Sequence, residues 1–212
     1  DSVRDVKTLP IYVDKEKIEN TPITFDLHAR YPWHFVILTV SRLAPEKNLS
    51  LAIETLSLVR QHFPNTGLLI VGSGSEERNL KSKVSSLKLE GAVEFAGWQT
   101  DLASFYKTAN VFIQTSLFEG YGLSLIEAGL SGLPVLTTPV GIAKEFEDGK
   151  EAYLCSSAEQ FAERIVKLIE DNQIRESLKF NMKRTLEGKL ISKADYMAKI
   201  KENWEKIATA VI

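Results

Sequence analysis

Two carboxylates lie eight positions apart in this chain, at Glu119 and Glu127, with a Gly-Tyr-Gly turn between them at 120–122. The apolar pattern after the turn predicts a helix that begins at Gly122. A turn at a helix N-terminus presents free backbone N–H groups, which suit an anionic ligand such as a phosphate. Carboxylates accept hydrogen bonds from hydroxyl groups. The layout therefore predicts a ligand that combines phosphate and hydroxyl groups, as a nucleotide-sugar does.

The second carboxylate falls on the apolar stripe of the expected helix. Leu123, Ile126 and Leu130 form the stripe at i, i+3 and i+7, and Glu127 takes position i+4. A core-facing carboxylate without a partner has a heavy desolvation cost, so we expect Glu127 to accept hydrogen bonds from ligand hydroxyls. The alternative is a side chain that leans out to solvent. Glu119 is either a ligand contact or an ordinary loop carboxylate.

Two cations follow the first predicted strand, in the segment Ser41-Arg42-Leu43-Ala44-Pro45-Glu46-Lys47. Ligands of open α/β sheets bind beyond the carboxyl ends of the strands. Arg42 and Lys47 are therefore placed to neutralise a diphosphate, the first by a forked contact and the second as a point charge. The alternative is a surface loop whose cations are solvated or paired with Glu46.

Other nucleotide-binding motifs are incomplete or absent. Gly72-Ser73-Gly74 follows a predicted strand, but no third glycine completes a dinucleotide fingerprint, and a tight turn explains the pair equally well. No Gly-x4-Gly-Lys-Ser/Thr occurs, which disfavours a P-loop enzyme. No Asp-x-Asp occurs either, and the three histidines are scattered. We therefore expect neither a metal ion nor another cofactor.

Composition narrows the class of protein. The 212 residues have a net charge of −2, so no basic field suggests nucleic-acid binding. The single cysteine, Cys155, excludes an internal disulfide and fits a reducing compartment. The longest uncharged stretch, Ala128–Ala143, carries two prolines and several glycines and is not expected to span a membrane. The chain starts without Met in a charged segment, so we expect it to be part of a longer protein.

From residue 35 onward, short apolar runs alternate with amphipathic segments of helix length, which predicts an α/β domain with a doubly wound parallel sheet. The expected strands are Phe35–Ser41, Leu68–Val71, Val93–Ala96, Asn110–Thr115, Leu133–Thr137 and Ala152–Cys155. The expected helices are Pro45–Phe63, Glu76–Leu87, a short helix to Thr108 capped by Thr100, Gly122–Leu130, and a helical region from Ala158 onward with breaks near Asp171-Asn172 and Gly188.

We divide the chain into three parts. Residues 1–32 read as a linker, with an extended piece at Leu9–Asp14 and a brief helix at Thr24–Arg30. Residues 33–190 form a Rossmann-like domain. Residues 191–212 form a terminal helix, on which Tyr196, Ile200, Trp204 and Ile207 recur at helical spacing.

Taken together, these residues resemble the nucleotide-sugar-binding half of a retaining glycosyltransferase of family 4, also called group 1. The resemblance runs from about Leu9 to the C-terminus. Its most specific pieces are Ser41-Arg42-Leu43 with Glu46-Lys47, and the Glu-x7-Glu motif from Glu119 to Glu127. The supporting pieces are Val71-Gly72-Ser73-Gly74, Val93-Glu94-Phe95-Ala96-Gly97-Trp98 and Gly132-Leu133-Pro134-Val135.

The resemblance implies a GT-B fold, in which two Rossmann-like domains face each other across a cleft. Arg42 and Lys47 would bind the donor diphosphate and neutralise its charge, as a metal ion does in other enzymes. We expect these two cations to lie at the other end of the sheet from the Glu-x7-Glu motif. Glu119 would contact the donor sugar near its reacting ring, and Glu127 would bind the ribose. The other donor-binding residues would be Gly120, Tyr121, Gly122 and Leu123 through backbone amides, Gly97 and Trp98 near the base, and Gly72 and Gly74.

The resemblance implies a further, N-terminal domain that binds the acceptor, and we expect it to lie outside this sequence. We therefore expect the chain to bind a nucleotide-sugar weakly and to transfer little sugar by itself. The expected location is the cytoplasm, with membrane association depending on the missing domain. Two other functions stay open: a non-catalytic nucleotide-sugar-binding module, and a GT-B epimerase. The sequence leaves the base, the sugar, the acceptor and a use in polysaccharide biosynthesis undetermined.

Overall fold

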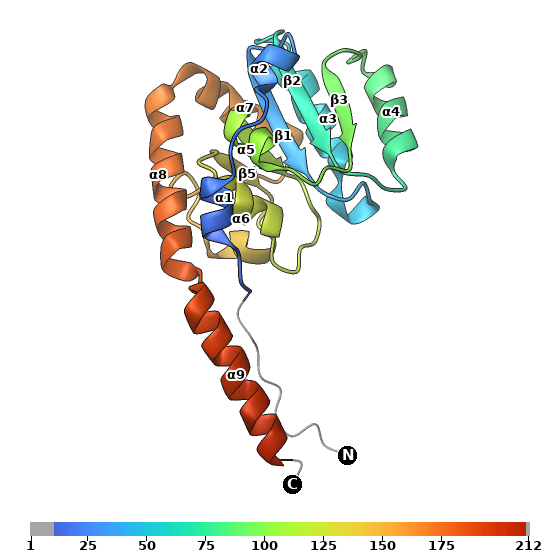
Figure 1. The fold of residues 1–212 in the computed structure, drawn as a ribbon. Helices are drawn as coiled ribbons and strands as arrows, with labels where there is room; N and C mark the ends of the chain where they lie inside the picture. Colours follow the sequence, from blue (N-terminus) through green and yellow to red (C-terminus); the bar gives the residue numbers. More distant parts are fainter. Residues whose placement is uncertain (1–10, 211–212) are drawn as a thin grey trace.

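The computed structural model describes residues 11–210, with the backbone alone for 207–210. Leu9 and Pro10 of the expected extended piece, and the Ile207 side chain, lie outside the described part. Six parallel strands form one sheet in the order β3-β2-β1-β4-β5-β6, with helices on both faces (Figure 1). This confirms the predicted Rossmann-like α/β class. The strands are β1 (Phe35–Val40), β2 (Thr66–Val71), β3 (Val93–Gly97), β4 (Val111–Gln114), β5 (Val135–Thr137) and β6 (Tyr153–Leu154).

In the described part of the chain, two helices precede β1, four lie in the connections between β1 and β5, and three follow β6. They are α1 (Lys15–Asn20), α2 (Leu27–Arg30), α3 (Leu49–Val59), α4 (Glu77–Ser86), α5 (Ala103–Thr108), α6 (Leu123–Leu130), α7 (Ala158–Glu170), α8 (Asn172–Lys189) and α9 (Lys193–Ala210), with short 3-10 helices η1 (Pro45–Lys47) and η2 (Gly141–Glu145).

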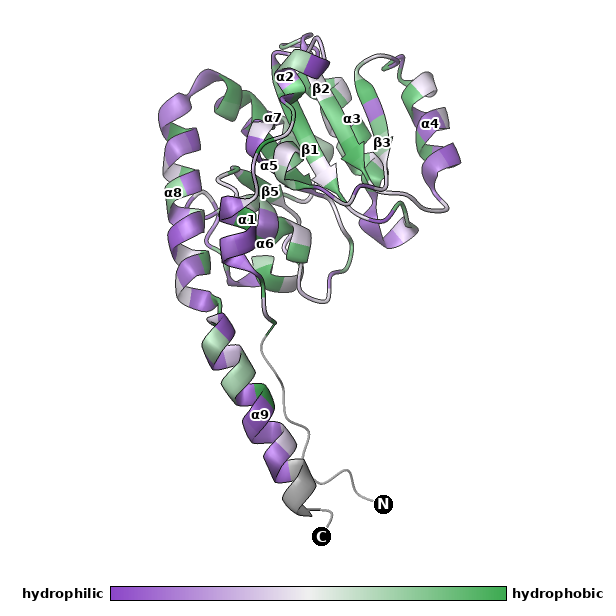
Figure 2. Cartoon of the chain, viewed as in Figure 1, coloured by the Kyte–Doolittle hydropathy of each residue, from purple (hydrophilic) through white to green (hydrophobic). Residues whose placement is uncertain are grey.

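Both faces of the sheet are buried, because side chains alternate along each strand. Ile37 of β1 packs under α3 and α7, in a cluster with Ile53 and Phe161. Its neighbour Leu38 packs under α5 and α6, with Phe105. This explains why the central strands read as continuous apolar runs. Figure 2 shows the apolar residues gathered on the strands, while α8 and α9 are mainly hydrophilic.

The strand order brings the predicted site residues together. β1 pairs directly with β4, with Ile37 opposite Val111. The loop after β1 carries Arg42 and Lys47, and the loop after β4 carries Glu119. Because β1 and β4 are neighbouring parallel strands, both loops start at the carboxyl ends of the strands, on the same side of the sheet. The expectation that the cations come from the other end of the sheet is therefore wrong.

Several boundaries also differ from the prediction. The expected helix from Pro45 is split, because Asn48 adopts a left-handed conformation with φ of 47° between η1 and α3. The N-cap position of α5 is Leu102, not Thr100, and Asp101 Oδ1 accepts a hydrogen bond from the Ala103 amide at 3.1 Å. α8 runs through Gly188 and ends at Lys189. The local residue pattern predicts neither η2 nor the six-residue helix α1, which Asp14 caps through the Lys17 amide.

The last helix extends away from the body of the molecule (Figure 1). Tyr196 on α9 stacks on Tyr12, with ring centroids 5.2 Å apart. Met197 and Trp204 are exposed on the same helix. Part of the apolar face predicted for this helix is therefore open to solvent in this chain. No described helix is both long enough and apolar enough to cross a membrane.

Candidate functional site

A groove of about 600 Å³ opens at the carboxyl ends of β1 and β4. It contains the predicted cations, both predicted carboxylates and the turn between them. The lining residues are Ile11, Val40, Ser41, Arg42, Lys47, Glu119, Gly120, Tyr121, Gly122, Leu123, Ser124 and Glu127. Eight of the twelve residues predicted for the site therefore line one cavity. Such a position is where open α/β sheets bind their ligands.

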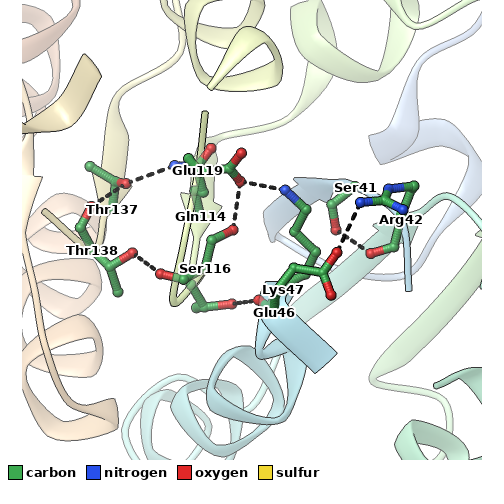
Figure 3. A network of polar contacts seen from close by, with 10 residues as sticks. Ser41, Arg42, Glu46, Lys47, Gln114, Ser116, Glu119, Thr137 and Thr138 are labelled. Atoms are coloured by element: carbon green, nitrogen blue, oxygen red, sulfur yellow. Dashed lines mark hydrogen bonds and ion pairs between the residues drawn. The ribbon is translucent and has the colours of Figure 1, made fainter. Parts of the chain in front are cut away.

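Lys47 and Glu119 form an ion pair inside the groove (Figure 3). Lys47 Nζ lies 2.7 Å from Glu119 Oε1, and the two side chains are only 14% and 12% exposed. Ser116 Oγ donates a second hydrogen bond to the same oxygen, also at 2.7 Å. Low exposure makes this charge-assisted contact stronger than an ordinary surface ion pair. Glu119 is therefore a positioned carboxylate, in contrast to the alternative of a free loop side chain.

Arg42 is held much more loosely. Its Nη2 lies 2.9 Å from Glu46 Oε1, but the Arg42 side chain is 76% exposed. An exposed pair of this kind contributes little to stability, because water screens it and both side chains lose freedom. The guanidinium can therefore leave Glu46 for an incoming anion. The partner that the sequence suggested for Arg42 is present, and the cation still faces the groove.

A hydrogen-bond network ties the loops after β1, β4 and β5 together (Figure 3). Thr115 Oγ1 donates to the Lys47 carbonyl at 3.0 Å, and the Leu117 amide donates to the Glu46 carbonyl at 2.8 Å. From the β5 side, Thr138 Oγ1 donates to the Ser116 carbonyl at 2.5 Å. These contacts fix the backbone on either side of the ion pair.

Beneath the turn lies a buried amide. Gln114 Nε2 donates to Thr137 Oγ1 at 3.2 Å. Gln114 Oε1 is buried without a hydrogen-bond partner among the described residues. A Cβ at Gly122 would lie 3.6 Å from this oxygen, so the Gln114 side chain supports the turn from below.

The turn itself depends on glycine. Gly122 is the N-cap of α6 with φ of 104°, in the left-handed region that glycine tolerates. No side chain caps this helix, so the amides of its first turn are left for another acceptor. The Tyr121 carbonyl accepts a hydrogen bond from the Ile142 amide at 2.8 Å. That contact needs Gly141, since a Cβ there would lie 2.5 Å from the Tyr121 oxygen. The turn therefore presents donor groups to the groove, as the sequence predicted.

Glu127 lies deeper, on α6, and is half-buried. Its Oε2 accepts a hydrogen bond from the buried Tyr106 hydroxyl at 3.0 Å. Burial raises the pKa of Glu127, although the Tyr106 hydrogen bond and the charge of Lys17 act in the opposite direction. Burial, together with the neighbouring Glu127 charge, also holds the pKa of Tyr106 well above its usual value. Glu127 Oε1 has no partner among the described residues, so it can accept a hydrogen bond from a ligand.

A second cavity, of about 310 Å³, adjoins the groove at Leu123 and Glu127. Its other walls include Tyr12, which precedes α1, Lys17 on α1, and residues 100–103, which lead into α5. Glu127 therefore lines both the groove and this second cavity, so a ligand in the groove has room to extend past this carboxylate.

Four predicted residues do not line the groove. Gly72 and Gly74 lie against the β1 loop, where a Cβ would come within 1.9 Å of the Ser41 carbonyl oxygen and 2.3 Å of the Leu43 carbonyl oxygen, respectively. Their absence of a side chain allows this close backbone contact. Gly97 ends β3 with φ of 68°, and Trp98 beyond it is 71% exposed.

Among the residues that the sequence pattern did not single out, three contact the motif directly. Ser116, Tyr106 and Gly141 hold Glu119, Glu127 and the turn, respectively. Ser116 lies three residues before Glu119, which was a usable signal. Tyr106 and Gly141 lie on other elements, and no local pattern connects them with the motif. In the part of the chain that the structure describes, no group of three or more His, Cys, Asp or Glu side chains is arranged to hold a metal ion.

Comparison with known proteins agrees with this fold. A family described as glycosyl transferases group 1 matches residues 26–185, which is more than half of the chain. The chain therefore belongs to the group 1 glycosyltransferase family. It is 32% identical over 169 residues to poly(glycerol-phosphate) alpha-glucosyltransferase of Bacillus subtilis, covering 78% of this chain and 24% of the relative.

Two further proteins extend the comparison. The GtfA subunit of UDP-N-acetylglucosamine–peptide N-acetylglucosaminyltransferase of Streptococcus pneumoniae is 28% identical over 189 residues, covering 84% of this chain and 36% of the relative. Anabaena HepE, solved in complex with UDP and glucose, superimposes with a TM-score of 0.74 at 26% identity, covering 81% of this chain and 48% of HepE. The chain thus spans 24% to 48% of the length of these proteins.

Proposed function

We propose that this chain is the donor-binding domain, the C-terminal half, of a retaining glycosyltransferase of family 4. The whole protein would transfer a sugar from a nucleoside-diphosphate-sugar to an acceptor such as a glycan or a glycolipid. One observation carries the proposal: a single groove brings Arg42, Lys47, Glu119 and Glu127 together with the N-terminus of α6. HepE, which is solved with UDP-glucose, shares the fold and supports the choice of ligand.

Each group has a distinct task in the proposed complex. Arg42 and Lys47 bind the diphosphate and stabilise the negative charge that grows on it as the sugar departs. The free amides at the start of α6 bind the same anion, which the helix dipole favours. Glu119 accepts hydrogen bonds from the sugar, close to the ring that reacts. Glu127 accepts hydrogen bonds from the ribose, and the base extends beyond it. These tasks need no metal ion, because the cations come from side chains.

Calorimetric titration of the chain with UDP, GDP and ADP tests the site. We expect one of the three to bind, and Arg42→Ala and Glu127→Ala each to weaken that binding. Arg164→Ala is a matched control, because Arg164 pairs with Asp148 away from the groove. If none of the three nucleotides binds the wild-type chain, the proposed site is wrong. Equal losses in Arg42→Ala and Arg164→Ala would also contradict it.

Activity needs a separate experiment, because we propose that the acceptor domain lies outside this sequence. We expect the chain alone to bind its donor weakly and to release little sugar from a labelled nucleotide-sugar, with or without acceptor. Turnover at the rate of a complete enzyme would contradict this. Epimerised nucleotide-sugar among the products would favour the epimerase over the transferase. We also propose a cytoplasmic location, which is consistent with one unpaired, buried cysteine.

A further inference from the structure

We propose that Glu119 selects the intact nucleotide-sugar over the free nucleoside diphosphate by competing with the diphosphate for Lys47. The inference rests on the proposed function, since it takes the groove to be a nucleoside-diphosphate site. It adds a second task to Glu119: this carboxylate lowers the affinity of the groove for the product that remains after transfer.

The contact that carries the inference is the ion pair itself. Lys47 Nζ lies 2.7 Å from Glu119 Oε1, and both side chains are largely shielded from water. No other acceptor contacts the Lys47 ammonium among the described residues. A diphosphate that binds this ammonium must therefore share it with a carboxylate or displace that carboxylate. Breaking a shielded pair leaves an uncompensated charge, so the displacement has a free-energy cost.

Both residues are anchored at this position, Lys47 through its backbone and Glu119 through its carboxylate. The Lys47 carbonyl accepts a hydrogen bond from Thr115 Oγ1 at 3.0 Å, which anchors the backbone below the ammonium. Ser116 Oγ holds the carboxylate through Glu119 Oε1 at 2.7 Å, and the Ser116 carbonyl is in turn held by Thr138. The carboxylate therefore stays in the groove when an anion arrives at the Lys47 ammonium.

The two ligands differ in what they offer this carboxylate. A free nucleoside diphosphate brings only negative charge near Glu119, so it competes for Lys47 and is repelled as well. A nucleotide-sugar brings hydroxyl donors too. Glu119 Oε2 has no partner among the described residues and can accept them. The sugar thereby compensates for the loss at Lys47, and the free diphosphate does not.

The neighbouring cation provides a matched control in the same loop. Arg42 pairs with Glu46 at 2.9 Å, but this pair is exposed. Glu46→Gln and Glu119→Gln remove the same charge, each from a carboxylate paired with a groove cation. Water already weakens the exposed pair, so releasing Arg42 changes little. A general effect of net charge would appear in both variants, whereas competition for Lys47 appears in only one.

The experiment is calorimetric titration of the wild-type chain and both variants with three ligand pairs: UDP and UDP-glucose, GDP and GDP-glucose, ADP and ADP-glucose. For the pair that the wild type binds, we expect Glu119→Gln to bind the nucleoside diphosphate about threefold to tenfold more tightly. We expect no gain for the nucleotide-sugar, so that the preference for the intact donor falls. Glu46→Gln should leave both affinities within about twofold of wild type.

A second variant keeps the test decisive if Glu119→Gln does not fold. Ser116→Ala removes the anchor of the carboxylate, and we expect a smaller shift in the same direction. Unchanged or weaker nucleoside diphosphate binding in Glu119→Gln overturns the inference and leaves the proposed function intact. An equal gain for both ligands, or an equal gain in Glu46→Gln, also overturns it. If the wild type binds none of the six ligands, the proposed function itself fails.

Discussion

Tyr106 on α5 donates its phenolic hydrogen to Glu127 on α6 at 3.0 Å, which joins the second carboxylate of the motif to a helix that the motif does not contain. The hydrogen bond opposes the effect of burial on Glu127, because it favours the ionised form and lowers the pKa that burial raises. It also leaves one carboxylate oxygen available to a ligand. Tyr106 is therefore a positioning residue for the ribose contact that we propose.

Replacing this tyrosine should affect both stability and binding. We expect Tyr106→Phe to lower the free energy of unfolding by about 1 kcal/mol, because Glu127 loses a hydrogen-bond donor. The pKa of Glu127 should rise further, and nucleoside diphosphate binding should weaken. Denaturant unfolding and calorimetry measure the two effects. Tyr153→Phe is the control, since Tyr153 is buried beside Arg164 and its hydroxyl has no hydrogen bond among the described residues.

Glu127→Gln should stabilise the protein while it weakens ligand binding. Burial raises the pKa of Glu127. At a pH between the ordinary carboxyl pKa and this raised pKa, the folded chain therefore holds a proton that the unfolded chain has lost. Stability due to this group is therefore lost as pH rises from the ordinary carboxyl pKa through the raised one. Glutamine keeps the hydrogen bond to Tyr106 without the charge. The melting temperature of the variant should exceed that of the wild type by more at pH 7 than at pH 4.

A difference in melting temperature between the two proteins that stays constant from pH 4 to pH 7 would contradict the role of the buried Glu127 charge. A glutamine variant that gained stability and still bound the nucleotide as tightly as wild type would contradict the proposed contact between Glu127 and the ligand.

Gly141→Ala should damage the turn from behind. Gly141 has φ of 58°, and a Cβ would lie 2.5 Å from the Tyr121 carbonyl and 2.9 Å from Glu119 Cβ. We expect a loss of about 1–3 kcal/mol in the free energy of unfolding and a loss of nucleotide binding, since the turn must move. Gly91→Ala separates strain from collision: Gly91 has φ of 76°, but a Cβ there meets nothing within 4 Å. It should lose stability and retain binding.

The two cations should differ in stability while they agree in function. Arg42→Ala should change the free energy of unfolding by no more than about 0.5 kcal/mol, because its pair is exposed. Lys47→Ala should lower it by about 1–3 kcal/mol, because it leaves the shielded Glu119 charge unpaired. Both variants should weaken nucleoside diphosphate binding. Equal stability losses would mean that the Lys47–Glu119 pair is no stronger than a surface pair.

Removing residues 193–212 should leave the sheet domain folded. α9 extends from the body, and the stack of Tyr196 on Tyr12 is its main ring contact there (Figure 1). An aromatic pair of this kind is worth about 0.5–1.5 kcal/mol, so the melting temperature should fall only slightly. We expect nucleotide binding to persist in the shortened chain. Loss of a cooperative melting transition would show that the terminal helix belongs to the folding unit.

The residue pattern predicted the order of strands and helices well, because each element is decided by nearby residues. The apolar run at β1 and the stripe on α6 come from local periodicity, which a single sequence displays. Boundaries were less certain where one residue adopts an unusual conformation. Asn48 ends η1 in the left-handed region, and no property of the surrounding stretch reveals that.

The candidate site could be predicted where residue type and local position alone indicate the kind of ligand. Cations after a strand, and a glycine turn before a helix, suit an anionic ligand wherever the rest of the chain lies. The sequence therefore predicted an anion-binding site with two carboxylates, and the binding of phosphate there stays a prediction. It also carried the family resemblance, which the match over residues 26–185 confirmed at the level of group 1 glycosyltransferases.

Only the tertiary structure decided which of these charges meet. The pairing of β1 with β4 places Lys47 and Glu119 in contact although 72 positions separate them, and it leaves Arg42 to its own neighbour, Glu46. The packing of α5 on α6 likewise gives Glu127 its partner in Tyr106. The physical reason is range: periodicity and turn chemistry act over a few residues, whereas strand order determines which distant side chains share one groove.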